Sequence, residues 1–192
     1  MASKTKVATE LPLFPMPVCL LGANVNKKPN FNTLAWFNMI DSKPYIIGVS
    51  SSRRHYTNKG VYENRTFSVN IPSVEMVAIT DYCGLHSGWK IDKSSIFGIF
   101  YGKLKTAPMI QECPINMECR LVNVVKLPNH EFIVGEIVGA YADKDCVDNG
   151  KPDMQHINPL IYDELNRYWR LGEQVAKAFN TGKTYEPKTM QK

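Results

Sequence analysis

The feature that most constrains this chain is a series of short segments, each rich in β-branched and aromatic residues and bounded by glycine, proline or asparagine. Segments of this kind predict β-strands. We place them at residues 18–23, 33–40, 45–50, 66–71, 96–103, 115–127 and 131–141. Strands this closely spaced, without a helix of similar length between each pair, favour an antiparallel barrel or sandwich over a parallel α/β sheet. The fold class that we predict is mainly β (α+β).

Turn residues identify two of the connections. The sequence Asp-Ser-Lys-Pro at residues 41–44 is a turn signal between the second and third predicted strands. Leu-Pro-Asn at residues 127–129 separates the two longest segments. We therefore expect residues 115–141 to form a long antiparallel hairpin.

Two short helices are predicted between strands. One covers residues 57–63, with the Thr57 hydroxyl as its cap. The other covers residues 73–82, with Ser73 as its cap, and ends before Gly84.

The strongest helical pattern comes near the end of the chain. Asn158 can cap this helix, and Pro159 suits its first turn. Apolar side chains then recur at steps of three or four, at Ile161, Leu165, Tyr168, Leu171, Val175 and Phe179. This spacing predicts an amphipathic C-terminal helix that closes at Gly182.

Length and charge set broad limits. The chain has 192 residues, the length of one domain, and we expect a core at about 12–182 and a loose polar tail at 183–192. Hydrophobic residues make up 44% and charged residues 21%, as in an ordinary globular protein. The balance of 23 Lys and Arg against 18 Asp and Glu gives a net charge of +5. This charge favours an anionic ligand but is too small to indicate a nucleic-acid-binding protein.

Several patterns are missing from the sequence. No apolar run approaches the roughly 20 residues of a membrane-spanning helix, and the N-terminus has no signal-peptide core. The five cysteines include no CxxC pair, and the four histidines show no metal-ligand spacing. We therefore expect reduced thiols in a cytoplasmic protein, with no metal and no membrane partner. Glycine-rich nucleotide-binding motifs and the GxSxG motif of hydrolases do not occur either.

A first polar cluster surrounds the start of the second predicted strand. It contains Asn30, Asn32, Thr33, Ala35 and Trp36. Amide and hydroxyl groups beside a tryptophan suit the rim of a site for a flat ligand. The alternative interpretation is a polar turn followed by a core tryptophan.

A second cluster runs from a strand end into the predicted helix at 57–63. It combines hydroxyl, guanidinium and imidazole groups on Ser50, Ser51, Ser52, Arg53, Arg54, His55 and Thr57. Such groups at a helix start are typical of a phosphate site. The alternative interpretation is a solvated strand-to-helix loop.

Two further features complete the candidate site. In residues 81–93, Ser87 and Gly88 would let backbone approach a ligand closely, and Lys93 could add a positive charge beside a phosphate. Cys83 in the same segment suits either a redox thiol or a small buried packing residue. His130 begins the last predicted strand and could shuttle a proton, or be an ordinary loop residue.

In their order and spacing, these segments resemble the flavin reductase-like, FMN-binding split-barrel family, and most closely its flavoredoxin-like branch. The resemblance covers most of the chain, through residues 15–18, 29–36, 50–57, 67–72, 87–93, 130–136 and 168–172. It implies a Greek-key split barrel, usually a homodimer with FMN at or near the subunit interface.

The resemblance also implies roles for individual residues. It places Asn30, Trp36, Thr57 and Lys93 in contact with the flavin, with Ser50, Ser51 and Ser52 lining the same site. Ser87, Gly88, Arg53 and Arg54 would lie at the phosphate end. His130 would lie near the reacting ring or the nicotinamide, although Pro-Asn-His stands here in place of the family's Gly-Asp-His.

The resulting hypothesis is an FMN-containing oxidoreductase that takes hydride from NADH or NADPH and passes electrons to a second flavin or a protein partner. A first alternative is a flavoredoxin-type electron carrier that is reduced by a redox protein. A second alternative, a small β-barrel that binds nucleic acid, would need a continuous basic stripe, which this sequence lacks.

Overall fold

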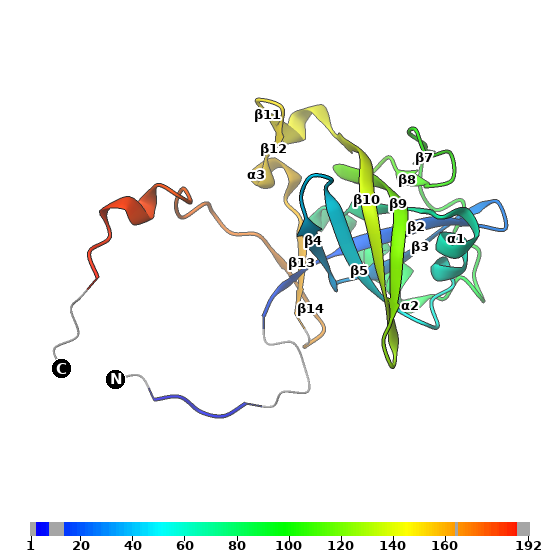
Figure 1. Cartoon of the computed structure of the whole chain (residues 1–192), viewed down its shortest axis with the longest axis horizontal. Helices are drawn as coiled ribbons and strands as arrows, with labels where there is room; N and C mark the ends of the chain where they lie inside the picture. The colour runs from blue at the N-terminus through cyan, green and yellow to red at the C-terminus, as the bar shows by residue number, and fades with distance from the viewer. Residues whose placement is uncertain (1–2, 8–13, 164, 188–192) are drawn as a thin grey trace.

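The computed structural model describes residues 3–7, 14–163 and 165–187. Its largest element is an antiparallel sheet with the strand order β3-β2-β6-β9-β10-β5-β4. The strands are β2 (Cys19–Val25), β3 (Lys28–Leu34), β4 (Phe37–Asp41), β5 (Ile46–Ser52), β6 (Thr66–Ile71), β9 (Ile115–Lys126) and β10 (His130–Ala142). Figure 1 shows β2 and β3 running across the direction of β5, β9 and β10, so the sheet bends as a split barrel does.

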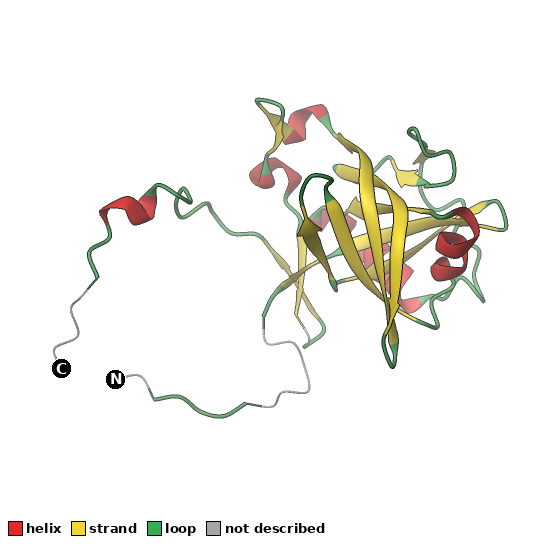
Figure 2. Ribbon diagram, viewed as in Figure 1, coloured by secondary structure: helices red, strands yellow, loops and turns green. Residues whose placement is uncertain are grey.

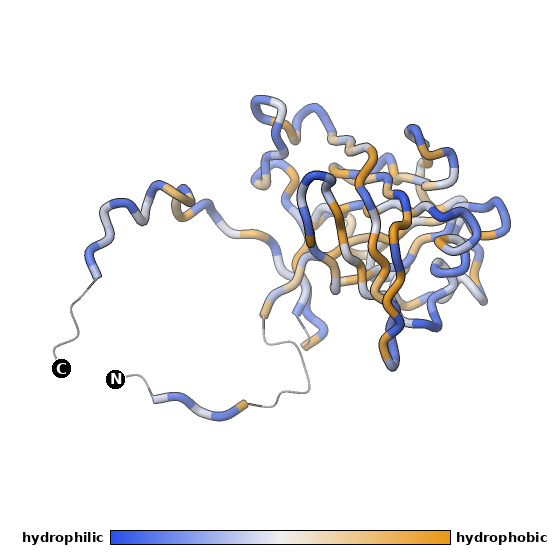
Figure 3. Tube along the Cα trace, in the orientation of Figure 1, coloured by the Kyte–Doolittle hydropathy of each residue, from blue (hydrophilic) through white to orange (hydrophobic). Residues whose placement is uncertain are grey.

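One hydrophobic core joins the two halves of this bent sheet. Side chains of β2, β5, β6, β9 and β10 all contribute to it, among them Leu21, Val49, Phe67, Leu121 and Ile133. Each of these five side chains is buried. The apolar colouring of Figure 3 follows the strands, whereas the loops around them are largely hydrophilic.

The predicted hairpin is confirmed. Strands β9 and β10 pair in antiparallel register from Glu131 opposite Lys126 to Ala142 opposite Ile115. The predicted strand at 66–71 has the bounds of β6, and the turn at 41–44 connects β4 to β5. These elements could be predicted because their alternating side chains and turn residues act locally.

Two predicted strands need correction. Residues 33–40 form the end of β3 and most of β4, because Ala35 and Trp36 between them belong to neither strand. Residues 96–103 contain only β7 (Ile99–Phe100), which pairs with β8 (Met109–Ile110). The rest of this segment is a loop that packs Phe97 into a second core cluster beneath α2.

The helices between strands are present with different ends. Figure 2 shows them as short segments beside the sheet. They are α1 (Thr57–Asn64), η1 (Val74–Met76) and α2 (Val77–Leu85), so Gly84 lies within α2. The Thr57 cap is wrong, because Tyr56 holds the cap position of α1; Ser73 holds the cap position of η1 as predicted, although its side chain makes no capping bond. The Thr57 hydroxyl instead accepts a hydrogen bond from Asn30.

The predicted C-terminal helix is wrong. After η2 (Lys144–Cys146), β11 (Val147–Asp148) and β12 (Lys151–Pro152), the chain forms α3 (Met154–Ile157) and then a hairpin. This hairpin consists of β13 (Leu160–Asp163) and β14 (Arg167–Arg170), and β13 also pairs with β1 (Met16–Pro17). The hairpin therefore occupies residues for which the apolar spacing predicts a helix.

Two asparagines explain this outcome. Asn158, expected to start a helix, ends α3 with a φ of 46°, and Asn166 has a φ of 59° in the hairpin turn. Asparagine tolerates this left-handed conformation better than most residues do. Asp163 supports the turn, since its carboxylate accepts hydrogen bonds from the backbone N–H groups of Leu165 and Arg167.

Beyond β14, the chain passes beside α3, where Gln155 Nε2 donates a hydrogen bond to the oxygen of Gly172, and then leaves the body of the molecule (Figure 1). Residues 171–187 include only the short helix η3 (Thr181–Thr184). All of these residues are exposed. Of the predicted tail at 183–192, residues 188–192 lie outside the described part of the chain. Within the described ranges, no helix has the length and apolar character needed to cross a membrane.

Candidate functional site

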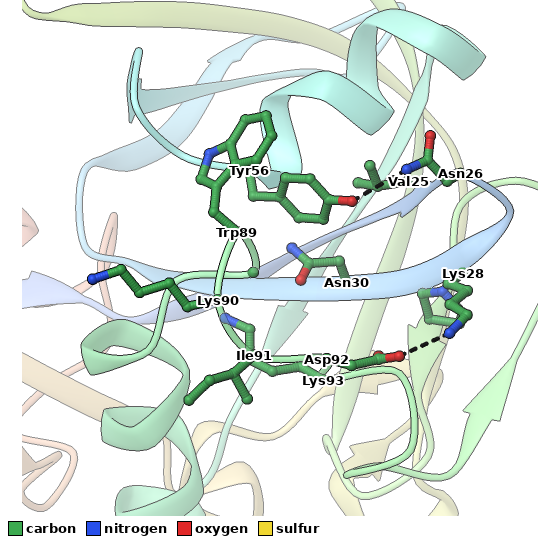
Figure 4. Close-up of a pocket in the computed structure, with 12 residues that line it drawn as sticks. Val25, Asn26, Lys28, Asn30, Tyr56, Trp89, Lys90, Ile91, Asp92 and Lys93 are labelled. Atoms are coloured by element: carbon green, nitrogen blue, oxygen red, sulfur yellow. Dashed lines mark hydrogen bonds and ion pairs between the residues drawn. The ribbon is translucent and has the colours of Figure 1, made fainter.

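Two cavities follow one another along β3, and most of the predicted site residues lie on or beside them. The first cavity has a volume of about 370 Å³ and is shown in Figure 4. The second has a volume of about 540 Å³. Asn30 lines the first and Thr33 the second, while Tyr56 and His55 take the corresponding places on the loop before α1.

The first cavity has an aromatic wall and a polar floor. The rings of Tyr56 and Trp89 pack edge to face with their centroids 4.6 Å apart (Figure 4). Across the cavity, Lys28 Nζ lies 2.9 Å from Asp92 Oδ2. Asn30 Nδ2 donates a hydrogen bond to Thr57 Oγ1 at 2.7 Å, which ties β3 to the first turn of α1.

Lys93 lies under the first cavity and is almost completely buried, with 1% of its surface exposed. Its ammonium group donates hydrogen bonds to the backbone oxygens of Cys83 at 3.1 Å and His86 at 2.7 Å. Both oxygens lie at the carboxyl end of α2, where a positive charge is favourable. Burial lowers the pKa of Lys93 from its ordinary value. Backbone oxygens of the described residues thus accept two of the three ammonium hydrogens.

Gly88 is required by close packing. A Cβ atom at this position would collide with the side chains of Asn30 and Tyr56. The backbone of residues 87–89 can therefore lie directly against β3 and the loop before α1. The sequence predicted that the Ser87-Gly88 pair approaches a ligand closely, and that contact stays a prediction.

The second cavity combines aromatic rings with hydroxyl and imidazole groups. Its lining includes the predicted site residues Thr33, Ala35, Trp36, Ser50, Ser52, His55 and His130. The rings of Trp36 and His130 lie with their centroids 5.0 Å apart at an angle of 34°. Trp36 is 41% exposed, so it is a rim residue and not the core tryptophan of the alternative interpretation. His130 is brought here because β10 pairs with β5, which places His130 opposite Ser52.

His55 lies half-buried between β3 and β5. Its Nδ1 atom is 3.0 Å from Ser51 Oγ and 3.2 Å from Asn32 Nδ2. Burial lowers the pKa of His55 from its ordinary value, and the nearby charges of His130 and Lys93 lower it further. His55 is therefore a neutral imidazole at neutral pH.

The hairpin β13–β14 closes the far side of the second cavity. The Tyr168 hydroxyl donates a hydrogen bond to Asp81 Oδ1 at 2.9 Å, which connects the hairpin to α2. Burial and this bond raise the pKa of Tyr168 well above its ordinary value. Tyr162, on the neighbouring strand, also lines the cavity.

Lys93 lines the first cavity, whereas six other predicted residues lie outside both cavity linings, namely Asn32, Ser51, Arg53, Arg54, Thr57 and Ser87. Arg53 and Arg54 are exposed and line neither cavity, while the Lys93 ammonium is turned toward helix carbonyls. That these three cations meet at one phosphate stays a prediction. Cys83 is buried, and burial raises the pKa of its thiol to about 11, as suits a packing residue.

The residues present fit the flat, anionic cofactor that the sequence led us to expect. Asn32 is only 7% exposed, yet its amide oxygen has no hydrogen-bond partner among the described residues. A buried amide atom left unpaired costs free energy unless a ligand completes its bonding. Aromatic side chains line both cavities, and a ring system could lie against them.

Comparison with known proteins identifies the family of this chain. The family model described as the flavin reductase like domain matches residues 11–169 of this chain. The chain belongs to this family. The family and the mainly β, split-barrel fold predicted from the sequence are thereby confirmed.

Several known proteins resemble this chain closely. The crystal structure of flavoredoxin from Methanosarcina acetivorans has a TM-score of 0.92 and 46% identity, over 95% of this chain and 98% of that chain. Flavoredoxin of Desulfovibrio vulgaris (Miyazaki F) has a TM-score of 0.86 and 32% identity, over 95% of this chain and 100% of that chain. A protein of Archaeoglobus fulgidus is 32% identical over 147 residues, which are 75% of this chain and 81% of its own.

Some cavity residues in this flavin reductase like chain were not predicted. Tyr56 and Trp89 flank residues that were singled out, so the signal was an aromatic ring next to each polar cluster. Asp81 and Leu85 line the second cavity from α2. Tyr162 and Tyr168 were missed because they were assigned to a helix, and pairing between distant strands leaves no local signal.

Proposed function

We propose that this chain binds FMN along the two cavities and acts as an oxidoreductase that passes electrons through it. The observation that carries the proposal is the unpaired, buried Asn32 amide beside cavities with aromatic walls, in a member of the flavin reductase like family. FMN supplies the redox chemistry when bound, while the chain supplies binding, orientation and access.

The required affinity is physically reasonable for this site. A micromolar Kd corresponds to about −8 kcal/mol. A hydrogen bond to a charged group contributes roughly 1.5–3 kcal/mol, and the ordering of ligand and side chains opposes binding. Two or three polar contacts therefore do not suffice. Burial of a ring system against Trp36, or against Tyr56 and Trp89, supplies the remainder.

His130 is the proposed catalytic residue. It lies beside Trp36 at the rim of the second cavity, where a nicotinamide could reach the cofactor from solvent. An imidazole at this position could hold a proton or orient the carboxamide of NADH or NADPH. His130→Ala should slow reduction by the nicotinamide more than it weakens FMN binding.

A second candidate function is that of an electron carrier. It is favoured by the two similar structures named flavoredoxin, at 46% and 32% identity. The net charge of +5 would then favour docking onto an acidic redox partner, with rates that fall at high salt. We also retain the proposals that the chain forms a homodimer and is cytoplasmic.

Anaerobic reduction distinguishes the two candidates. The FMN-loaded protein is mixed with NADH or NADPH, and the visible absorbance of the flavin is followed. Rapid bleaching supports the nicotinamide-dependent oxidoreductase. Failure of both nucleotides to bleach the flavin, together with rapid reduction by a ferredoxin-like protein, would select the electron carrier.

A further inference from the structure

A chain of polar side chains leads from Glu131 to His55. Glu131 is 9% exposed, and its Oε2 accepts a hydrogen bond from Asn58 Nδ2 at 3.1 Å. The Tyr62 hydroxyl also bonds to Glu131. Asn58 Nδ2 donates a second hydrogen bond, to the backbone oxygen of Ser52 at 3.0 Å. Both amide hydrogens of Asn58 are therefore engaged, and its orientation is fixed.

The orientation of Asn58 determines the proton of Ser51. Asn58 Oδ1 lies 2.7 Å from Ser51 Oγ, and an amide oxygen can only accept. Ser51 must therefore donate its single hydrogen to Asn58. Its 3.0 Å contact with His55 Nδ1 then requires a hydrogen on Nδ1. A neutral imidazole carries one N–H, so the other nitrogen, Nε2, has a free lone pair.

Asn32 fits this assignment only with its amide turned over, because its NH₂ group, a donor, lies 3.2 Å from the same Nδ1 atom. Its oxygen is the atom that has no partner among the described residues. A protonated Nδ1 favours the amide oxygen on its side, which leaves the NH₂ group unpaired instead. In either orientation one amide atom of Asn32 stays available to a ligand.

We propose that Glu131 is a positioning residue which, through Asn58 and Ser51, holds His55 as the Nδ1–H tautomer and gives the second cavity a hydrogen-bond acceptor at Nε2. Nδ1 faces the buried Ser51 and Asn32, whereas the ring itself lines the second cavity. The acceptor selects ligands that carry an N–H or O–H donor. The imide N–H and the ribityl hydroxyls of FMN are donors of this class.

The identity of the ligand rests on the proposed function, but the tautomer is a property of the protein alone. It is measured on the ¹⁵N-labelled protein without flavin, by long-range ¹H–¹⁵N correlation at about two pH units above the ordinary histidine pKa. We expect a pyrrole-type Nδ1 and a pyridine-type Nε2 for His55. The reverse pattern would overturn the proposal.

Ser51→Ala tests the chain of contacts, with Ser52→Ala as the matched control on the same strand. Loss of the Ser51 oxygen removes one acceptor of Nδ1–H and lets the Asn32 NH₂ group donate to Nδ1 instead, so the Nε2–H form should become dominant, while Ser52→Ala keeps Nδ1–H. Glu131→Gln should produce a mixture, because its amide lets Asn58 turn over. If the tautomer of His55 is unchanged in both Ser51→Ala and Glu131→Gln, the proposal is contradicted. If Ser51→Ala does not fold, an unchanged tautomer in Glu131→Gln alone contradicts the proposal.

Titration with FMN separates this proposal from the proposed function. Loss of one neutral hydrogen bond should raise the Kd of Ser51→Ala for FMN by about threefold to tenfold. An unchanged Kd would mean that Nε2 meets no ligand donor. If FMN does not bind to the wild-type protein at all, the proposed function fails, while the tautomer of the flavin-free protein still tests the role of Glu131.

Discussion

Lys93 shows how a single residue can serve both the fold and the site. Its ammonium group joins two backbone oxygens at the end of α2 and lies under the first cavity. From the sequence, Lys93 was expected to be a flavin-binding charge. Its role at the helix end could not be predicted, because nothing in the local pattern places residue 93 beneath residues 83 and 86.

Lys93→Met should therefore lower stability as well as FMN affinity. The variant leaves the oxygens of Cys83 and His86 without their donor, and an unpaired buried carbonyl costs about 1–3 kcal/mol. We expect a loss of that size in urea unfolding followed by tryptophan fluorescence. Lys90→Met changes an exposed lysine of the same loop and is the control. Equal stability of the two variants would refute the structural role of Lys93.

His55 should make the protein sensitive to acid. Its pKa is lowered in the folded state, first by burial and then by His130 and Lys93. The neutral form therefore stabilises the fold above the unfolded value of about 6.5, and this stability is lost as the pH falls through the folded pKa. Wild type should lose more unfolding free energy than His55→Gln between about pH 7 and pH 5. A difference in unfolding free energy between wild type and His55→Gln that does not change with pH would contradict the lowered pKa of His55.

At the scale of elements, the terminal hairpin differs most from the structure that the sequence predicts. Residues 160–170 carry a helical pattern of apolar residues, yet they pair as β13 and β14 and close the second cavity. The helical interpretation failed because it ignored Asn158 and Asn166, whose positive φ angles interrupt a helix. The hairpin β9–β10, by contrast, was predictable because each of its strands is long and alternating.

Asn166→Gly distinguishes the hairpin from a helix. Glycine adopts a positive φ without strain, so the hairpin should keep its stability or gain slightly. A helix would lose a few tenths of a kcal/mol (about 0.3) from the same change, because asparagine is itself a poor helix former. Asn166→Val should destabilise the hairpin by about 1 kcal/mol or more, because a β-branched side chain disfavours this conformation. Equal effects of the two substitutions on the unfolding free energy would be incompatible with the turn.

Glu118 on β9 anchors the loop after β7. Its carboxylate accepts hydrogen bonds from the N–H groups of Lys103 at 3.0 Å and Leu104 at 2.6 Å, and from the Tyr141 hydroxyl at 2.8 Å. Burial alone would raise the pKa of Glu118, but these donors lower it below its ordinary value. Its contribution to stability is therefore present above about pH 4.3 and is lost as the pH falls through the folded pKa.

Glu118→Gln should destabilise the protein by about 2–3 kcal/mol at pH 7, since an amide NH₂ would face donors. The exposed Glu173 offers a matched control, Glu173→Gln. Unfolding in urea should show that the difference in unfolding free energy between the two variants is smaller near pH 4 than at pH 7. A difference that stays constant would show that the carboxylate charge is unimportant.

At the scale of the whole molecule, residues 171–187 extend from the body (Figure 1). Val175 is 97% and Phe179 98% exposed, so neither side chain is buried within its own chain. Large apolar side chains exposed in this way favour an interaction surface, and the proposed homodimer would cover them. The sequence does not predict that this segment is exposed, because its apolar spacing fits a packed helix equally well.

Truncation after Arg170 tests this interpretation. The shortened chain should keep its β-sheet circular dichroism, because it loses no buried side chain, but sedimentation should show a shift from dimer to monomer. Val175→Ser combined with Phe179→Ser should have the same effect in the full chain, with Lys177→Ser as a control. A full-length protein that is already monomeric, or a truncated one that stays dimeric, would rule out this role.

Much of the site could be predicted from the sequence because its polar clusters lie at strand ends that one sheet brings together. Asn30, Trp36, Ser52, His55 and His130 reach the two cavities as expected. The hydrogen bonds that orient His55 pass through Ser51 and Asn58, which are near in sequence, to Glu131 on β10, which is distant from both. Such contacts depend on strand register, for which the sequence gives no local signal.

The visible absorption spectrum of the purified protein, before and after addition of FMN and gel filtration, tests the central claim most directly. We predict that the protein retains flavin and shows its yellow absorption, and that Trp36→Ala retains less. A colourless protein that takes up no FMN would contradict the account.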